Sequence, residues 1–304
     1  MDAIGFTHII NPVGVDAHHP LFEVQKITFA SILNAVRYST KAKVQLLTTQ
    51  YEEDKSCIPE GFNITSNLTR SVQDVGQFNK PTKYPLIADI LQKALENSTY
   101  DYILFSNMDI GLMPHFYDFV AAELNIHGYD SMLITRRRIG LQYKTVEQLP
   151  EIYADLGRPH PGYDMFVMHR EVVARLVLDK ICVGVPFLEV SLLHNLVAFS
   201  QNLKLYDKAH LTFHIGMEVM PPVNLAFYWH NRNSFEKHIL PVIKPHLAGE
   251  KFPYTELSFW NRMLKWGLNP CYRTALMLEM EMMGMMRKVK FLLDEIRWWI
   301  LQGR

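Results

Sequence analysis

The chain has 304 residues and a mass of 35.4 kDa, enough for one large α/β domain or for one domain with an appendage. Its 31 basic and 31 acidic residues cancel, and this balance argues against a general nucleic-acid binder, which usually carries a basic excess. Nearly half of the residues are hydrophobic, so a sizeable core is expected.

The cysteines and the apolar segments favour a cytoplasmic location. Cys57, Cys182 and Cys271 lie far apart without CxxC spacing, which is typical of a reducing compartment. Residues 1–6 show no basic stretch before an apolar run, and no segment reaches the length of a membrane span. The three Asn-x-Thr sequons are therefore interpreted as chance matches.

Strands and helices alternate through the first hundred residues. Such alternation predicts a mostly parallel sheet with helices on both faces. The expected elements, in chain order, are a strand at 6–10, a helix at 22–38, strands at 44–48 and 68–72, and a helix at 85–95.

The next strand, 102–105, ends in a polar segment that contains Asn107 and Asp109. An acid at the carboxyl end of a central strand lies where open α/β sheets bind their ligands. Its carboxylate would be a natural ligand for Mg²⁺ or Mn²⁺ carrying a phosphorylated substrate. A turn or cap between strand and helix explains Asp109 equally well.

The second half continues the pattern less regularly. The expected elements are helices at 116–124 and 187–198, a helix start at 169–171, turns at 157–162 and 182–186, and strands at 131–135, 163–168, 204–206 and 211–214.

Three consecutive arginines, Arg136, Arg137 and Arg138, follow the strand at 131–135. Neighbouring residues of a strand alternate in direction, so at most two of them share a face. A solvated edge is favoured slightly over contact with a phosphate or an acidic substrate.

Beyond residue 220 the sequence becomes helical and aromatic, and residues 275–299 are rich in Met, with Trp298 and Trp299 near the end. Two interpretations stay open for these helices. One is peripheral contact with a membrane, and the commoner one is packing on the domain or on a second subunit, giving a homo-oligomer.

Three residues carry the chemistry if the sheet is wound as predicted. Asp109 ends a central strand, Glu189 lies in the first turn of a helix, and His214 ends a late strand. A carboxylate and an imidazole are a plausible ligand pair for Mn²⁺, and a second carboxylate can act as a general base. Each signal is weak alone, and their order along the chain strengthens them.

That order resembles the GT-A-fold glycosyltransferases over roughly residues 5–220. The resemblance is one of pattern, and four segments carry it: Ser106-Asn107-Met108-Asp109, Gly162 to Val167, Val185 to Val190, and Leu211 to Gly216. It implies a Rossmann-like GT-A fold of the α/β class, with a mixed, mostly parallel sheet and a helical C-terminal extension. The implied division is a catalytic domain at 1–220, with a nucleotide half at 1–113 and an acceptor half at 114–220, followed by the extension at 221–304.

The resemblance also implies roles for individual residues. Asp109 matches the last acid of the family's Asp-x-Asp motif, and His214 matches the late histidine that completes its metal site. Glu189 matches the acid near the acceptor hydroxyl, and Asp164 lies where such enzymes touch sugar or acceptor, although it could simply cap a turn. Asn107 departs from the motif, because the family's first Asp is expected there, and this puts metal dependence in doubt.

Nucleotide contacts are expected from Thr48 and Thr49, which end the second strand, and from Lys83 and Asp89 near the following helix. Surface solvation explains these four residues equally well.

The implied function is transfer of a sugar from a nucleotide-sugar donor to a carbohydrate, lipid-linked or other hydroxyl acceptor, with Mn²⁺ or Mg²⁺ as cofactor and no nucleic-acid partner. Two alternatives remain. A non-catalytic sugar- or nucleotide-binding protein of the same fold is supported by Asn107. A sugar nucleotidyltransferase is disfavoured because the N-terminal region lacks a glycine-rich phosphate loop.

Overall fold

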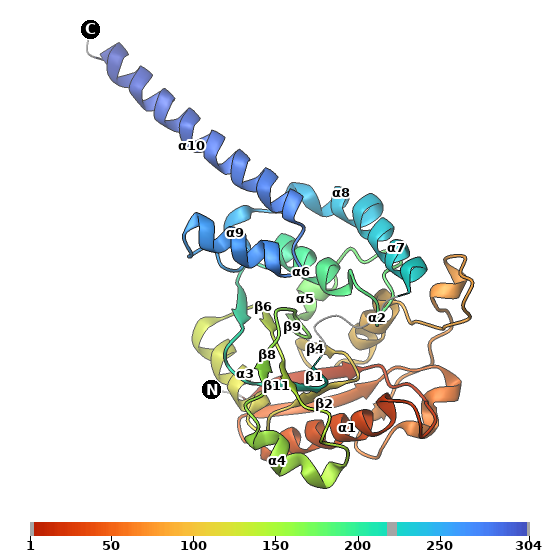
Figure 1. Cartoon of the computed structure of the whole chain (residues 1–304). Coiled ribbons are helices and arrows are strands. Elements are labelled where there is room, and N and C mark those ends of the chain that lie inside the picture. The colour runs from red at the N-terminus through yellow and green to blue at the C-terminus, as the bar shows by residue number, and fades with distance from the viewer. Residues whose placement is uncertain (1–2, 218–223, 303–304) are drawn as a thin grey trace.

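Seven strands form the central sheet of the computed structural model, which describes residues 3–217 and 224–302 (Figure 1). Their order is β10-β6-β9-β4-β1-β2-β3, and every neighbouring pair is parallel except the two pairs made by β9. The predicted mixed, mostly parallel sheet is therefore confirmed. The strands are β1 Ile4–Ile10, β2 Ala42–Thr48, β3 Asn63–Ile64, β4 Tyr102–Ser106, β6 Ser131–Ile134, β9 Met165–His169 and β10 Leu203–Tyr206.

Helices cover both faces of this sheet, as the alternating pattern predicts. Side chains alternate along β4, so that Ile103 and Phe105 face one layer while Leu104 faces the other. The helices α1 and α3 pack on the side of Leu104, and α2, α5 and α6 pack on the opposite side. Their bounds are α1 Leu21–Tyr38, α2 Ile87–Asn97, α3 Phe116–His127, α5 Arg170–Val173 and α6 Leu188–Phe199.

A second, four-stranded sheet has the order β5-β11-β7-β8 and was not expected from the sequence. Its core side chains, which include Ile139 and Phe213, pack against Ile27 of α1 and against α4. The short strand β5 begins four residues after β4 ends, so the two sheets are joined through the segment that contains Asp109. The elements are β5 Ile110–Leu112, β7 Arg137–Ile139, α4 Leu149–Ala154, β8 Arg158–Pro159 and β11 Thr212–Ile215.

The helices after residue 224 share the core of the central sheet. Phe235, Ile239 and Trp266 are buried in the same cluster as residues of α2 and α6. The predicted division near residue 220 falls within 218–223, outside the described residues, and it stays a prediction. The helices are α7 Leu225–Ser234, a π turn Phe235–Ile239, α8 Leu240–Ile243, α9 Phe259–Leu268 and α10 Thr274–Gln302.

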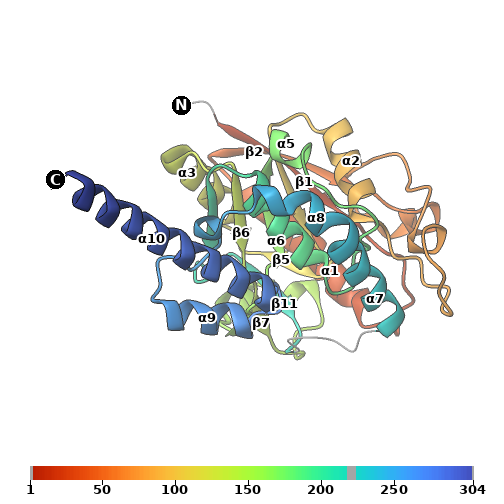
Figure 2. The ribbon, with the colours of Figure 1, turned by 90° about the horizontal axis from the view of Figure 1, so that it is seen from above.

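The last helix, α10, leaves the body of the molecule and extends away from it (Figures 1 and 2). Its first turn is anchored, because Leu276 and Met277 are buried in the shared core. Across residues 3–217 and 224–302, no helix combines the length and the apolarity that crossing a membrane requires.

The strand predicted at 68–72 is wrong. Leu68 and Val72 are buried, but their backbone N–H groups donate to the carbonyls of Gln50 and Tyr84 rather than to one neighbouring strand. Val72 instead begins a 3₁₀ turn, and the strand in this region is β3, which pairs with β2. The segment is therefore an irregular loop anchored at two points.

Candidate functional site

The carboxyl ends of the parallel strands lie at one edge of the central sheet and bring several predicted residues together. Met165 pairs with both Ser106 and Ile134, so the residue before it, Asp164, lies between the ends of β4 and β6. Asp109 follows β4, and Arg136 follows β6 at the same edge. This is the edge where open α/β sheets bind ligands.

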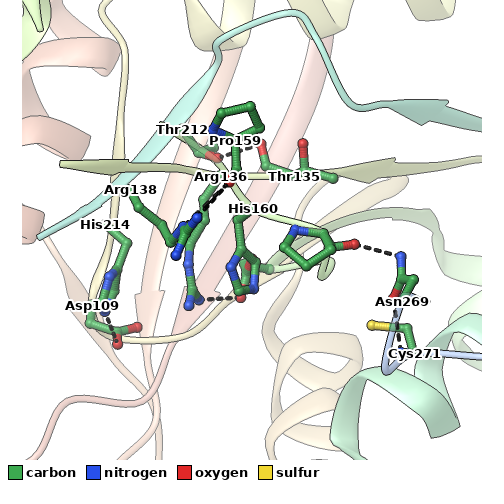
Figure 3. Close-up of polar contacts among 12 residues, drawn as sticks. Asp109, Thr135, Arg136, Arg138, Pro159, His160, Thr212, His214, Asn269 and Cys271 are labelled. Atoms are coloured by element: carbon green, nitrogen blue, oxygen red, sulfur yellow. Dashed lines mark hydrogen bonds and ion pairs between the residues drawn. The ribbon is translucent and has the colours of Figure 1, made fainter. Parts of the chain in front are cut away.

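Asp109 and His214 are in direct contact. His214 pairs with Ile110 across the antiparallel β5–β11 ladder, and its Nε2 atom lies 3.1 Å from Oδ2 of Asp109 (Figure 3). The close approach of the two strands requires Gly111, because a Cβ there would overlap the ring of Phe213. Although burial favours the protonated acid, the hydrogen bond and charge of His214, together with Arg136, lower the pKa of Asp109.

Arg136 and His160 lie beside this pair (Figure 3), and with Asp164 they form a second cluster. The guanidinium of Arg136 donates to Oδ1 of Asp164, whose side chain is only 3% exposed. The other oxygen, Oδ2, has no hydrogen-bond donor among the described residues, and Nε2 of His160 lies 3.9 Å from it. Burial and the charge of Asp109 raise the pKa of Asp164 to about 6 in spite of Arg136.

His160 remains neutral at physiological pH. Burial, followed by the charges of Arg136, Arg138 and His214, lowers its pKa to about 3. Its Nδ1 atom is buried and has no hydrogen-bond partner within the described part of the chain. Sequence reasoning did not select His160, although its position four residues before Asp164, in a Pro- and Gly-rich turn, was a usable signal.

The arginine run is not the solvated edge that the sequence favoured. The Arg136 side chain is 11% exposed and paired with Asp164. Arg137 and Arg138 are partly exposed, and both donate to backbone carbonyls, Arg137 to Leu156 and Arg138 to Pro159. Arg136 follows a central strand just as Asp109 does, and that shared position could have identified it from the sequence.

Glu189 lies in the first turn of α6, close enough to Asp164 and Asp109 for their charges to act on it. Partial burial, followed by the charge of Asp164, raises its pKa to about 7. The residue before the helix, Phe187, has φ of 78°, a left-handed conformation that is rare for a bulky side chain. Such strain is common at functional sites. Here it is supported by packing of the Phe187 ring against Tyr228 and Arg273.

Residues after α9 support the loop that carries Asp164. The side chain of Asn269 donates to the carbonyl of Pro161 at 2.5 Å and accepts from the backbone of Cys271 (Figure 3). The hydroxyls of Tyr163 and Tyr272 are 2.5 Å apart. No sequence pattern predicts the contacts of Asn269 with Pro161 and of Tyr163 with Tyr272, because the residues that they join are about one hundred positions apart.

The predicted nucleotide residues Thr48 and Thr49 are buried at the end of β2. Their hydroxyl oxygens and Oε1 of Gln50 find no hydrogen-bond partner among residues 3–217 and 224–302. Buried polar atoms are nearly always bonded, so three consecutive exceptions indicate a place for a ligand or for ordered water.

The other two predicted residues, Lys83 and Asp89, lie around Tyr51, which was not predicted. Nζ of Lys83 is 5.4 Å from the centre of the Tyr51 ring, while the Tyr51 hydroxyl donates to the carbonyl of Arg70. Lys83 is paired with Glu53 at 2.6 Å, and Asp89 is paired with Arg70 at 2.7 Å. The structure therefore gives both residues protein partners on the surface.

The donor set at Asp109 fits a divalent cation that shares its ligands with a phosphate. No group of three His, Cys, Asp or Glu side chains capable of holding a metal occurs in the described parts of the chain. Asp109 and His214 supply an oxygen and a nitrogen, and the nearby Asn107 has a buried Oδ1 without a partner among the described residues. Mg²⁺ and Mn²⁺ commonly bind through one or two protein ligands together with substrate phosphates.

No protein-family model and no curated protein matches this chain. Among solved structures, it is similar to S. aureus TarS in complex with UDP-GlcNAc, with a TM-score of 0.43 and 9% identity over 86% of this chain and 70% of that one. It is also similar to glucosyl-3-phosphoglycerate synthase from Mycobacterium tuberculosis in complex with phosphoglyceric acid, with a TM-score of 0.42 and 11% identity over 71% and 74% of the two chains. Likenesses at this level carry no inference about activity, and the fold class of this chain rests on its own strand order.

Proposed function

We propose that this chain is a glycosyltransferase that moves a sugar from a nucleotide diphosphate to an acceptor hydroxyl. The observation that supports the proposal most is the contact between Asp109 and His214 at the ligand-binding edge of the sheet. Glu189, in the first turn of α6, has a pKa of about 7, so it would supply a second acid for proton transfer.

The donor would lie across the ends of β1, β2 and β4. Thr48 and Thr49 would bind the nucleotide with the polar atoms that the protein leaves unpartnered among its described residues. Lys83 and Asp89, which lie around Tyr51, would border the nucleotide. Asp109 and His214, with the amide oxygen of Asn107, would hold the Mn²⁺ or Mg²⁺ ion. When bound, such an ion supplies positive charge beside the diphosphate oxygens of the leaving group.

Glu189 would act on the acceptor. For an inverting transfer, its carboxylate takes the proton of the acceptor hydroxyl while the acceptor oxygen bonds to the anomeric carbon. The bond between that carbon and the diphosphate oxygen breaks, and the nucleoside diphosphate leaves with the electron pair. Asp164, held by Arg136, would accept a hydrogen bond from a sugar or acceptor hydroxyl through Oδ2, which has no donor among the described residues.

The acceptor belongs to the broad class of carbohydrates, lipid-linked sugars and other hydroxyl compounds in this proposal. A cytoplasmic location and contact with a membrane surface through the C-terminal helices remain predictions from the sequence.

The test begins with a panel of nucleotide sugars, with and without Mn²⁺, and measures release of the nucleoside diphosphate. Metal-dependent release that Asp109→Ala abolishes would support the proposal. Binding of nucleoside diphosphates, seen as an increase in Tm, without any turnover would indicate the non-catalytic binding protein instead. Release of pyrophosphate from a nucleoside triphosphate and a sugar phosphate would indicate a nucleotidyltransferase.

A further inference from the structure

The four-stranded sheet carries a row of basic residues beside the pair formed by Asp109 and His214. His214 on β11 lies in register with Arg138 on β7, and Arg138 lies directly opposite Arg158 on β8. Residues in register on neighbouring strands point to the same face of a sheet, so all three side chains belong to one face. This face borders the candidate site, because His214 contacts Asp109 there.

The opposite face of the same sheet is apolar. Phe213, Ile215 and Ile139 alternate with the basic residues along β11 and β7, and all three are buried. A shift of register by one residue would bring the basic side chains into this core and expose the apolar ones. The packing of the sheet therefore fixes the face on which Arg138 lies.

Arg138 and Arg158 place like charges on directly opposite residues, an arrangement that is destabilising by itself. Neither arginine forms an ion pair within residues 3–217 and 224–302. Arg138 donates to the carbonyls of Pro159 and Met217, and these neutral acceptors hold the guanidinium in place without cancelling its charge. Arg158 is exposed. Two neighbouring positive charges without a described carboxylate favour the binding of an anion.

His160 connects this row with Asp164. It follows Arg158 by two residues, and Figure 3 shows it in the same group of side chains as Arg138. The His160 side chain is 6% exposed, and its Nε2 atom lies 3.9 Å from Oδ2 of Asp164. Nδ1 of His160 and Oδ2 of Asp164 are both buried without a hydrogen-bond partner among the described residues. Such atoms are a second, independent indication that a polar ligand binds beside the arginines.

The topology places this row away from the predicted nucleotide residues. Thr48 and Thr49 follow the end of β2 or lie in it, whereas β7 begins three residues after β6, which lies on the other side of β4 in the central sheet. Asp109 follows β4 and lies between the two regions. Across strands spaced about 5 Å apart, the backbone of Arg158 lies about 10 Å beyond His214. An anion bound there therefore belongs to the molecule opposite the nucleotide, which is the acceptor.

Two guanidinium groups match a phosphate better than a carboxylate. A phosphate monoester carries about −1.5 to −2 charges near pH 7 and presents three acceptor oxygens. Arginine binds such a group through paired N–H donors. A carboxylate has a single charge and would leave one of the two positive charges without compensation.

We propose that Arg138 and Arg158 bind a phosphate group of the acceptor, at a position separate from the pair formed by Asp109 and His214. The acceptor hydroxyl that reacts would then lie on the side of His160 and Asp164. The identification of the ligand as an acceptor rests on the proposed glycosyl transfer, whereas the phosphate site can be tested without turnover.

The experiment measures binding of glycerol 3-phosphate to the full chain by calorimetry, with glycerol as the uncharged probe. The protein is first saturated with Mn²⁺ and with the nucleoside diphosphate that raises its Tm most, so that the position of the donor phosphates is already filled. The wild-type chain should bind glycerol 3-phosphate and should not bind glycerol at the same concentration.

Two variants and one control assign the binding to the arginines. Arg158→Ala removes an exposed side chain and should raise the Kd for glycerol 3-phosphate at least about 10-fold, as should Arg138→Ala. The matched control is Arg37→Ala, which removes the same charge from an exposed position in the last turn of α1 and should leave this Kd unchanged.

Three results would overturn the proposal. They are no binding of glycerol 3-phosphate by the wild-type chain up to about 10 mM, wild-type affinity in both arginine variants, and an equal loss of nucleoside diphosphate binding in both, which would assign the arginines to the donor. Failure of the proposed function is distinguishable, because the wild-type chain would then bind no nucleoside diphosphate. The same titration without nucleotide would still test the phosphate site, and dependence of the Kd on Arg158 would support it.

Discussion

Asp109 and Glu189 lie at the same edge of the sheet, but their surroundings differ. Asp109 contacts His214 and lies near Arg136, and although burial favours the protonated acid, these two neighbours lower its pKa. For Glu189, burial and then the negative charge of Asp164 raise the pKa to about 7. The difference shows how one site can keep one carboxylate ionised and let another gain or lose a proton near neutral pH.

The largest expected effect on sugar transfer comes from removing Asp109, the acid whose pKa is lowered. Asp109→Ala should reduce sugar transfer at least about 10³-fold, because charge growing on the diphosphate would lose its stabilisation. The initial rate at saturating donor measures this loss. Asp101→Ala, which removes an exposed acid before the same strand, is the control and should retain activity. Wild-type turnover in Asp109→Ala would remove Asp109 from the mechanism.

Glu189→Gln should reduce transfer about 10²–10⁴-fold, the usual range for loss of a general base. Binding of the nucleoside diphosphate should remain unchanged, because Glu189 is assigned to the acceptor. Rate measurements combined with Tm shifts on nucleotide addition separate the two effects. Glu171→Gln changes an exposed glutamate and serves as the control. Equal loss of nucleotide binding and transfer would contradict the assignment.

Arg136→Ala removes the partner of the buried Asp164 carboxylate, and the cost should depend on pH. Above the pKa of Asp164, an unpaired buried charge remains, and we expect the free energy of unfolding to fall by about 1–3 kcal/mol. Below that pKa the acid is protonated and the loss should be smaller. Urea unfolding at pH 8 and pH 5 measures both values.

Arg138→Ala is the control for that experiment, because Arg138 bonds to backbone carbonyls and not to Asp164. It should show no comparable dependence on pH. Equal decreases in the free energy of unfolding for Arg136→Ala and Arg138→Ala at both pH values would contradict a stabilising ion pair between Arg136 and Asp164.

The pH profile of transfer tests Glu189 directly. A base must be ionised to accept a proton, so the rate should fall about 10-fold for each pH unit below about 7 and level off above it.

The contribution of Glu189 to the free energy of unfolding should change in the opposite direction with pH. A pKa raised by folding means that the folded state binds more protons, so this group makes the free energy of unfolding decrease as pH rises from about 4 to 7. Glu189→Gln should flatten the stability profile in that range, and an unaltered profile would be evidence against the raised pKa.

The smallest effect concerns Asn107. Asn107→Asp restores the acid that the resemblance to the GT-A family leads one to expect, and it adds a charged ligand beside Asp109. We expect Mn²⁺ to bind a few-fold more tightly in the presence of a nucleoside diphosphate, since ligand charge tunes affinity for hard cations. A Mn²⁺ titration followed by Tm measures the change, and weaker binding would show that the amide is the better ligand here.

Sequence patterns predicted the central layers well because each element there has a strong local signal. The alternation of β1, α1, β2, α2 and β4 can be recognised in the sequence pattern. The continuous apolar run of β4 likewise predicts that both of its faces are buried. The second sheet was missed because β5, β7 and β8 have two or three residues each. Strands that short leave no periodicity to detect.

The site was only partly predictable for a similar reason. Asp109 and Glu189 follow recognisable element boundaries, so their positions could be inferred. The pairing of Arg136 with Asp164 depends on β6 and β9 being neighbours, which is a tertiary fact. The support from Asn269 comes from a segment more than one hundred residues away from Pro161 along the chain.

The shared core has a practical consequence for shortening this protein. Ending the chain near residue 220 would remove Phe235, Ile239, Ile243 and Trp266, whose burial contributes about 1.5–3 kcal/mol for each large apolar side chain. That sum is comparable with the whole stability of a typical domain. A fragment ending there should aggregate on expression, whereas one ending just after Met277 retains the tie between Asn269 and Pro161 and should remain folded.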